Sequence, residues 1–203
     1  MAAPDRSKTN LCRIYKSLLP KNHGALVLKH RIHVCGLRNV SKTSEAIGAG
    51  HLVSAIEAHS FPKTPRNILR GRHLRLDMDD IAQAQPDMVL PSERHVLDLL
   101  DFVQSWDQKS PLLVHCFAGM SRSTACAYIA ICALNPQADE ERIGQSMRRL
   151  SATATPNRRL VALADDILGR DGRMIAAVSD MHACFNDVAT PFSVGPSDFL
   201  ETA

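Results

Sequence analysis

One short segment of the 203-residue chain combines residue types that suit nucleophilic chemistry on a phosphate. Residues 114–123 read VHCFAGMSRS, so that Cys116 precedes Arg122 by six positions. The apolar residues before this segment predict a buried strand, and the apolar, Ala-rich residues after it predict a helix. A strand–loop–helix turn can direct several backbone N–H groups inward, and the amino end of the helix adds positive potential. The segment therefore predicts a concave site for a tetrahedral anion.

The side chains of this segment fit the same chemistry. The guanidinium of Arg122 can bind two oxygens of an anion at once, which a lysine ammonium cannot do, and Gly119 permits backbone conformations that a side chain would obstruct. The positive potential favours the thiolate form of Cys116, a strong nucleophile. The hydroxyl of Ser123 can donate a hydrogen bond to that sulfur. The alternative is a Cys116 that is only a small buried residue, but His115 before it and Ser-Arg-Ser after it favour chemistry.

Residues 115–123 resemble the active-site signature HCxxGxxR(S/T) of the cysteine-dependent protein tyrosine phosphatases, especially the small dual-specificity-like branch. The resemblance implies an α/β fold with a central sheet flanked by helices on both faces. It also implies hydrolysis of phosphomonoesters through a phosphocysteine intermediate, with no metal and no cofactor. It assigns Cys116 as nucleophile, Arg122 as phosphate clamp, Ser123 as helper of thiolate departure and His115 as support of the loop. The residues implied to bind phosphate are Phe117, Ala118, Gly119, Met120, Ser121 and Arg122.

The general acid is expected upstream, in an acidic stretch that contains Asp77, Asp79, Asp80 and Asp87. The alternating pattern of residues 73–78 predicts a strand in which Asp77 lies on the face opposite the apolar side chains. Asp79 and Asp80 open the loop that follows. Asp80 lies 36 positions before Cys116, which best matches the placement of the acid in the phosphatases that the chain resembles. Asp80 is therefore the first candidate, Asp79 the second and Asp87 the third.

Related families and substrates leave alternatives open. Low-molecular-weight tyrosine phosphatases carry the Cys–Arg loop near the amino terminus, and rhodanese-like sulfur transferases usually lack the HC…G…SRS pattern, so both fit less well. Phe117, Ala118 and Met120 carry no charge, whereas phosphoinositide phosphatases often place lysine there. This difference favours a phosphorylated protein or a small phosphomonoester as substrate. A phosphate-recognition module with weak or no catalysis and an inositol-phosphate or lipid phosphatase remain the alternatives.

Composition and charge add few constraints on partners. The chain has a formal net charge of +3 and 4% aromatic residues, which gives no argument for nucleic acid. Four arginines, at positions 66, 70, 72 and 75, could attract acidic substrates, although a solvated surface is the simpler explanation. No apolar run is long enough to span a membrane. Six cysteines without CxxC pairs, two of them in an apolar helical stretch, predict reduced thiols and a cytoplasmic protein without a structural metal.

Around the motif, strands alternate with helices, which predicts one α/β domain. We expect an amino-terminal extension over residues 1–30, a phosphatase domain over 31–178 and a carboxy-terminal tail over 179–203, where periodicity is lost. Thr155 and Pro156 suggest the start of the last helix, and Gly169 its end. Asn157 could lie near the site, but capping or first-turn packing is the simpler assignment. The expected strands cover residues 32–35, 51–56, 73–78 and 112–115, and the expected helices cover a short stretch before Gly48 and residues 96–106, 124–134, 139–150 and 156–168.

Overall fold

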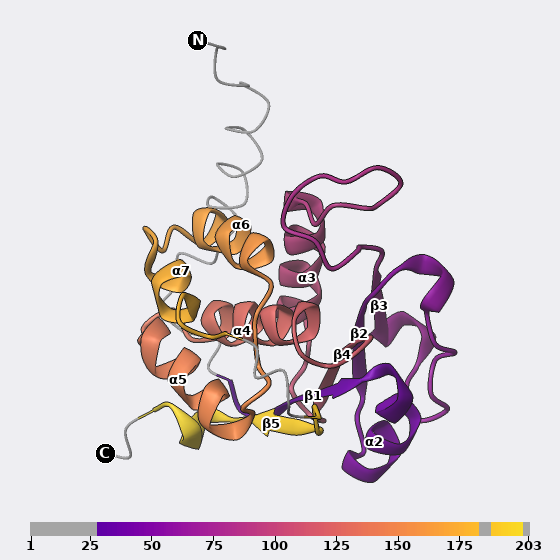
Figure 1. Ribbon diagram of the computed structural model, residues 1–203. Coiled ribbons are helices and arrows are strands. Elements are labelled where there is room, and N and C mark those ends of the chain that lie inside the picture. The colour runs from indigo at the N-terminus through magenta and orange to yellow at the C-terminus, as the bar shows by residue number, and fades with distance from the viewer. Residues whose placement is uncertain (1–27, 183–187, 201–203) are drawn as a thin grey trace.

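The computed structural model describes residues 28–182 and 188–200, which form a central sheet with helices on both faces (Figure 1). In this part of the chain the sheet has five strands in the order β3-β2-β4-β1-β5. The first four strands are parallel, whereas β5 runs antiparallel to β1. This architecture confirms the predicted α/β fold class. The strands are β1 (Ile32–Gly36), β2 (His51–Ala55), β3 (His73–Leu76), β4 (Leu112–Cys116) and β5 (Phe192–Val194).

The helices follow the apolar periodicity of the sequence. All the helices expected from the pattern are present, with ends that differ from the expectation by a few residues. Gly48 and Gly169 end their helices in left-handed conformations, as C-cap glycines commonly do. No helix in the described residues is long and apolar enough to cross a membrane. The helices are α2 (Val40–Ile47), α3 (Glu93–Ser105), α4 (Arg122–Leu134), α5 (Glu140–Leu150), α6 (Arg158–Leu168) and α7 (Arg173–Val178).

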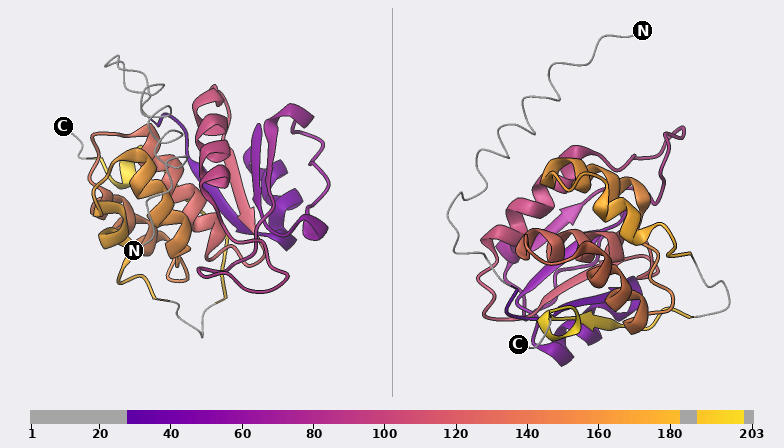
Figure 2. Two further views of the ribbon diagram at one scale, coloured as in Figure 1. Left: turned by 90° about the horizontal axis from the view of Figure 1, so that it is seen from above. Right: turned by 90° about the vertical axis from the view of Figure 1, so that its left-hand side faces the viewer.

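The two faces of the sheet bury alternate residues of its strands. In β4, Leu112 and Val114 belong to the main hydrophobic core, which α3 to α7 cover. The intervening Leu113 packs with Leu52 and Val40 in a smaller cluster on the side of α2. This alternation follows from the two-residue repeat of a strand. The sheet therefore lies between α2 and the other helices, as the views in Figure 2 show.

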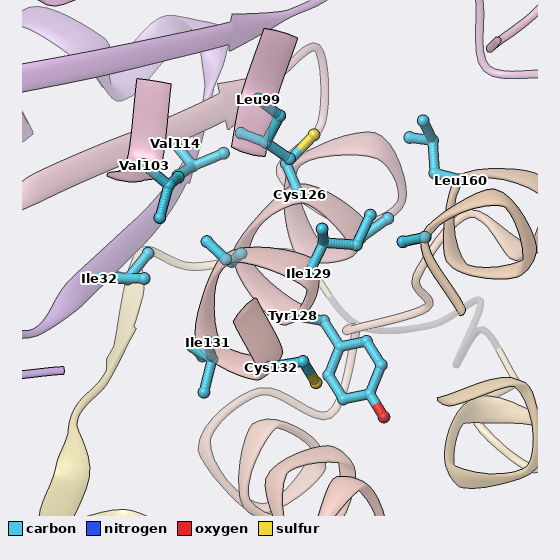
Figure 3. Packing of buried hydrophobic residues seen from close by; sticks show 14 of the residues in the cluster. Ile32, Leu99, Val103, Val114, Cys126, Tyr128, Ile129, Ile131, Cys132 and Leu160 are labelled. Carbon is cyan, nitrogen blue, oxygen red and sulfur yellow. The ribbon is translucent and has the colours of Figure 1, made fainter. Parts of the chain in front are cut away.

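Helix α4 forms the centre of the main core and is buried on nearly every side. Its small residues, alanine and cysteine, allow the sheet on one side and the neighbouring helices on the other to approach closely. Figure 3 shows Cys126, Tyr128 and Ile129 of α4 among side chains from α3, α6 and the sheet. A helix that is apolar all round is expected to be buried in this way. Because α4 begins at Arg122, this packing also fixes the end of the segment that is predicted to bind phosphate.

The carboxy-terminal part of the chain differs from the expected tail. Strand β5 lies within residues 179–203 and pairs with β1, and Val194 and Phe199 are buried in the main core. Arg31 binds this segment by donating hydrogen bonds to Ser193 and Asp198. The described part of the segment, 188–200, therefore packs on the domain. The predicted extension, 1–30, lies outside the described residues except for positions 28–30, of which Leu28 is buried. The domain boundaries themselves stay predictions.

The parallel strands direct their carboxyl ends to one edge of the sheet. Gly36 pairs with Cys116, and Ser54 pairs with His115, so β1, β2 and β4 end side by side. Loops at such an edge are the usual place for ligands in open α/β sheets. The segment singled out in the sequence begins at this edge.

Candidate active site

Cys116 ends β4 and is almost completely buried. The backbone N–H of Gly119 donates to its Sγ over 3.2 Å, and the Oγ of Ser123 lies 3.1 Å from the same sulfur. The sulfur is thus held between the loop and the first turn of α4. The sequence predicted the Ser123 contact from residue order alone. The candidate nucleophile therefore has a backbone N–H and a hydroxyl within hydrogen-bond distance.

Two glycines allow the loop to lie directly on β1. Gly119 has a φ of +83°, and a Cβ added there would lie 2.7 Å from the backbone nitrogen of Gly36. A Cβ added at Gly36 would in turn lie 3.0 Å from the carbonyl oxygen of Ala118. Any side chain at either position would push the loop away from the sheet. The glycine that the sequence analysis noted is therefore required both by its φ and by a close backbone approach.

The carbonyl groups of the loop are held by the chain around it. Leu37 N–H donates to the carbonyl of Phe117 over 3.0 Å, and Thr155 N–H donates to that of Met120 over 2.9 Å. The carbonyl of Ser121 accepts from Ala125 N–H within α4. In a trans peptide the N–H of the next residue points opposite to the carbonyl. The N–H groups of residues 118, 121 and 122 therefore point away from these partners, as a phosphate-binding loop requires.

Arg122 is the first residue of α4 and is buried beneath the loop. One terminal nitrogen, Nη1, donates to Glu57 Oε1 and to the carbonyl of Met78, each over 2.7 Å. Its Nε is buried without a hydrogen-bond partner and lies 4.0 Å from Asp80 Oδ2. A buried donor that lacks a partner is costly, so it indicates a site for an acceptor from outside the chain. The guanidinium is thus oriented from one side and open to an anion on the other.

The four candidate acids occupy different positions. Asp80 reaches the loop, where its Oδ1 accepts from Ser121 Oγ over 2.7 Å and from Asn157 Nδ2 over 2.9 Å. Asp79 accepts from the N–H of Val89 and so closes its own loop. Asp77 accepts from the backbone N–H of Ala58. Asp87 has a φ of 58° and is exposed. Asp80 and Asp79 both line the pocket, but only Asp80 has its carboxylate on the loop.

Asn157 caps a helix and also lies at the candidate site, two roles that were alternatives in the sequence. Its Oδ1 accepts from the backbone N–H groups of Arg159 and Leu160, which makes Asn157 the N-cap of α6. Thr155 and Pro156 therefore do not start the helix, because the side chain that satisfies the first free N–H groups comes two residues after Thr155. The amide nitrogen of Asn157 donates to Asp80, so the cap also holds the candidate acid.

His115 begins a buried chain of hydrogen bonds below the loop. Its Nδ1 lies 3.1 Å from the carbonyl oxygen of Cys116, and its Nε2 lies 2.6 Å from Ser54 Oγ. Ser54 Oγ lies 2.8 Å from Nε2 of His73, whose Nδ1 lies 2.8 Å from Thr64 Oγ1. The chain ends at Arg75, which donates to Thr64 over 2.9 Å. It connects the backbone of Cys116 with the exposed edge strand β3.

One arrangement of protons satisfies the whole chain. If His115 Nδ1–H donates to the Cys116 carbonyl, its Nε2 must accept from Ser54, which then accepts from Nε2–H of His73. The Nδ1 of His73 accepts from Thr64, which accepts from Arg75. Both imidazoles are neutral in this arrangement. Burial accordingly lowers the pKa of each histidine to about 4, and the positive charges of Arg122 near His115 and of Arg75 near His73 act in the same direction.

These groups line one pocket at the carboxyl edge of the sheet. Its lining includes Cys116, Arg122, Asp80 and most of the loop predicted to bind phosphate. The side chain of Phe117 is exposed on the rim. A larger cavity, of about 810 Å³, lies between α5 and α7, but its lining contains none of the predicted site residues. The chemistry of the side chains, and not the size of the cavity, identifies the site.

Sequence reasoning missed three residues that support the site: Glu57, Ser54 and His73. Glu57 follows directly after an apolar run that was recognised as a strand. Because parallel strands end at the same edge, an acid at that position was a usable signal for a partner of Arg122. Ser54 and His73 offered no local signal, because their contacts depend on the register of β2 with β3 and β4.

The other described cysteines are free and behave differently from a nucleophile. Burial raises the pKa of the thiols of Cys35, Cys126 and Cys132 to about 12. These three side chains therefore remain protonated and pack as small apolar groups. Cys12 and Cys184 lie outside the described residues.

Comparisons with known proteins agree with this geometry. The model of the protein-tyrosine phosphatase family matches residues 83–155, which include the loop, α4 and the segment up to Thr155. This part of the chain is therefore similar to protein-tyrosine phosphatases, and solved structures of similar fold include dual-specificity phosphatases. No curated protein matches the sequence.

Three solved structures illustrate the likeness of fold. Human DUSP28 shares 16% identity, with 68% of this chain and 87% of that chain covered and a TM-score of 0.51. DUSP15 shares 15% identity, with coverage of 73% and 88% and a TM-score of 0.52. The human tyrosine phosphatase-like serine/threonine/tyrosine-interacting protein shares 20% identity, with coverage of 68% and 91% and a TM-score of 0.51.

Proposed function

We propose that the protein hydrolyses phosphomonoesters without a metal or cofactor, through a phosphocysteine intermediate on Cys116. One observation carries this proposal. Cys116, Arg122 and Asp80 line the same pocket, and the buried Nε of Arg122 has no hydrogen-bond partner in the described residues. A nucleophile, an anion clamp and an acid at one site are the groups that this reaction needs.

In the first step, the thiolate of Cys116 attacks phosphorus and the bond from phosphorus to the ester oxygen breaks. Asp80 gives its proton to the leaving oxygen. The two hydrogen bonds that Asp80 Oδ1 accepts support this role, because they leave Oδ2 to carry the proton. Arg122 and the loop N–H groups bind the phosphoryl oxygens as their charge is redistributed.

In the second step, water attacks the phosphocysteine and gives a proton to the Asp80 carboxylate. The sulfur–phosphorus bond breaks, and inorganic phosphate and the thiolate are released. The hydroxyl of Ser123, 3.1 Å from the sulfur, supports this departure by donating a hydrogen bond to the thiolate. His115 acts indirectly, because it holds the carbonyl of Cys116 and touches no reacting atom.

The uncharged rim favours a phosphorylated protein or a simple monoester over an inositol with several phosphates. Phe117, Ala118 and Met120 line the pocket without a positive charge. An inositol polyphosphate needs additional cations next to the scissile group. Release of phosphate from phosphotyrosine, phosphoserine and phosphothreonine peptides, compared with inositol phosphates, tests this choice. Faster turnover of inositol phosphates would contradict it.

The covalent mechanism is tested by Cys116→Ser. This variant should hydrolyse an aryl phosphate at least a thousandfold more slowly, because a neutral hydroxyl replaces the thiolate, but should still bind vanadate or phosphopeptide. Turnover comparable to that of the unsubstituted chain would exclude the phosphocysteine. If the unsubstituted chain binds phosphopeptides but does not hydrolyse them, the protein is a phosphate-recognition module and not a phosphatase.

The acid is tested by Asp80→Asn, with Asp79→Asn as the matched control. Asp80→Asn should reduce kcat by about 10²–10⁴-fold for an alkyl phosphate, and much less for an aryl phosphate with an activated leaving group. The alkaline decline of kcat should also flatten, because that decline reports loss of the proton from the acid. The same behaviour in Asp79→Asn, and not in Asp80→Asn, would move the assignment by one residue.

A further inference from the structure

A second cavity, of about 740 Å³, is lined by positive charge. Arg66 and Arg70 come from the connection between β2 and β3, and Arg75 comes from β3 itself. The sequence analysis grouped Arg72 with these residues, but Arg72 pairs with Asp107 over 3.2 Å and does not line the cavity. No acidic residue contributes to the lining, which comprises Lys63, Thr64, Pro65, Arg66, Ile68, Arg70 and Arg75.

The four cations of this cavity are held close together without carboxylate partners. Among residues 28–182 and 188–200, none of them forms an ion pair. The loop that carries Lys63, Arg66 and Arg70 is fixed: Asn67 Nδ2 donates to the carbonyls of Ser44 and Ala49, and Ile68 N–H donates to that of Pro65. Like charges gathered on a fixed loop repel one another, and an anion relieves that repulsion.

The register of the sheet relates one residue of this cavity to the strand that leads to Cys116. Arg75 pairs with Ser54 on β2, and Ser54 pairs with His115 on β4. Since neighbouring strands are about 4.8 Å apart, the backbones of Arg75 and His115 are separated by roughly 10 Å. An extended peptide covers that distance in three or four residues, at about 3.3 Å for each.

We propose that this cavity binds an anionic group, a carboxylate or a second phosphate, on the phosphorylated protein that the active site hydrolyses. The proposal rests on the proposed function, and it adds a sequence preference to it: acidic residues at about three to five positions from the phosphorylated residue. The positive charge of the chain is mild as a whole, so this concentration at one cavity is what gives the preference.

Binding of two fluorescent phosphotyrosine peptides tests the proposal without turnover. One peptide has Glu at the third to fifth positions on both sides of the phosphotyrosine, and the other has Gln at those positions. Fluorescence anisotropy with the Cys116→Ser variant should give roughly three- to tenfold tighter binding of the Glu peptide, as expected for a few exposed ion pairs. This preference should disappear in Cys116→Ser carrying Arg66→Ala and Arg70→Ala, and should weaken with added salt.

The matched control is Cys116→Ser with Lys42→Ala and Lys109→Ala, which removes two exposed charges elsewhere and should keep the preference. Equal binding of both peptides, or loss of the preference in this control, would overturn the proposal. So would an effect of the Arg66 and Arg70 substitutions on binding to anionic lipid vesicles but not to the peptides.

Hydrolysis of an aryl phosphate by the chain with the native Cys116 separates the two proposals. With Arg66→Ala and Arg70→Ala, kcat and KM for this small ester should be unchanged. If neither chain hydrolyses it, the proposed function fails, whereas the peptide preference is still decided by binding.

Discussion

The two faces of the central sheet differ in chemistry. On the face covered by α3 to α7, the strands bury side chains such as Val114 and Val53 in a continuous apolar core. On the face of α2, the next residues along the same strands, His115 and Ser54, belong to a buried hydrogen-bond chain. One set of side chains in β2 and β4 therefore packs in the main core, whereas Ser54 and His115 join the hydrogen bonds beneath the loop that begins at Cys116. The two kinds of side chain belong to adjacent residues of the same strand.

The hydrogen-bond chain on the α2 side is stable only as long as each of its buried polar groups has a partner. Burial of a polar group costs free energy unless a hydrogen bond replaces its contact with water. The series of hydrogen bonds from Arg75 to the carbonyl of Cys116 meets this condition when both histidines are neutral. We therefore expect substitutions in the main core to change stability alone, and substitutions in the hydrogen-bond chain that reaches Cys116 to change both stability and turnover.

The largest expected effect is on the apolar face. Leu100 of α3 is fully buried in the main core, and Leu100→Ala removes apolar contacts and leaves a cavity. The free energy of unfolding should fall by about 2–5 kcal/mol, measured by urea denaturation. At a temperature where the variant is folded, kcat for an aryl phosphate should be unchanged. A tenfold loss of kcat in the folded variant would remove the distinction between the faces.

The next effect is the pH dependence of the stability that the hydrogen-bond chain contributes through His73. The pKa of His73 is lowered from 6.5 to about 4, so the unfolded chain takes up this proton at a higher pH than the native chain. The stabilisation from neutral His73 is complete above pH 6.5 and is lost as the pH falls toward 4. At pH 5 the loss is about 2 kcal/mol relative to pH 7. In His73→Gln, urea denaturation should show a decrease between pH 7 and pH 5 that is smaller by this amount. Equal decreases in both proteins would contradict the assigned neutral state.

A third comparison keeps the chemistry of the substitution constant. Ser54→Ala and Ser44→Ala each remove a fully buried hydroxyl on the α2 side, but only Ser54 contacts His115. Both variants should lose about 1–3 kcal/mol of stability, because a buried partner is left without its hydrogen bond. Only Ser54→Ala should lower kcat for an aryl phosphate. Equal kcat values would limit the chain of hydrogen bonds to a structural role.

The smallest effect is expected for Cys132→Ala in α4. Burial keeps this thiol protonated, with a pKa of about 12, so its loss removes packing and a hydrogen bond with Tyr128 but no charge. Stability should fall by roughly 1 kcal/mol, and kcat should stay the same. Thermal unfolding monitored by circular dichroism measures the first quantity, and aryl phosphate hydrolysis measures the second. A large loss of turnover would show that the apolar face also shapes the site.

The sequence was sufficient where the signal was local. Four strands and the longer helices follow from periodicity, and the Cys116 loop follows from nine adjacent residues. Strand β5 was missed because its three residues carry no pattern of their own and are held by pairing with β1 and by Arg31. Helix α7 has only six residues, too few for a clear repeat.

The same distinction holds within the candidate site. Asp80 and Asp79 are adjacent and chemically identical, so only their contacts separate them: Ser121 and Asn157 for one, and the Val89 N–H for the other. Glu57 and Ser54 reach the site through the register of parallel strands, which periodicity does not encode. Local pattern thus predicts the reacting groups, and long-range pairing selects the residues that orient them.

The contact between Gly36 and the loop has a consequence for folding kinetics. Gly36 of β1 lies against Gly119 in the loop that follows β4. Strands β1 and β4 pair in the sheet, but β2 and β3 lie between them in the sequence. Contacts of such long sequence separation are slow to form, because a large loop must close before they contribute. The 116–122 loop therefore lacks its support on β1 in any intermediate in which these two strands are unpaired. The shape of the loop therefore depends on the paired sheet and not on the motif alone.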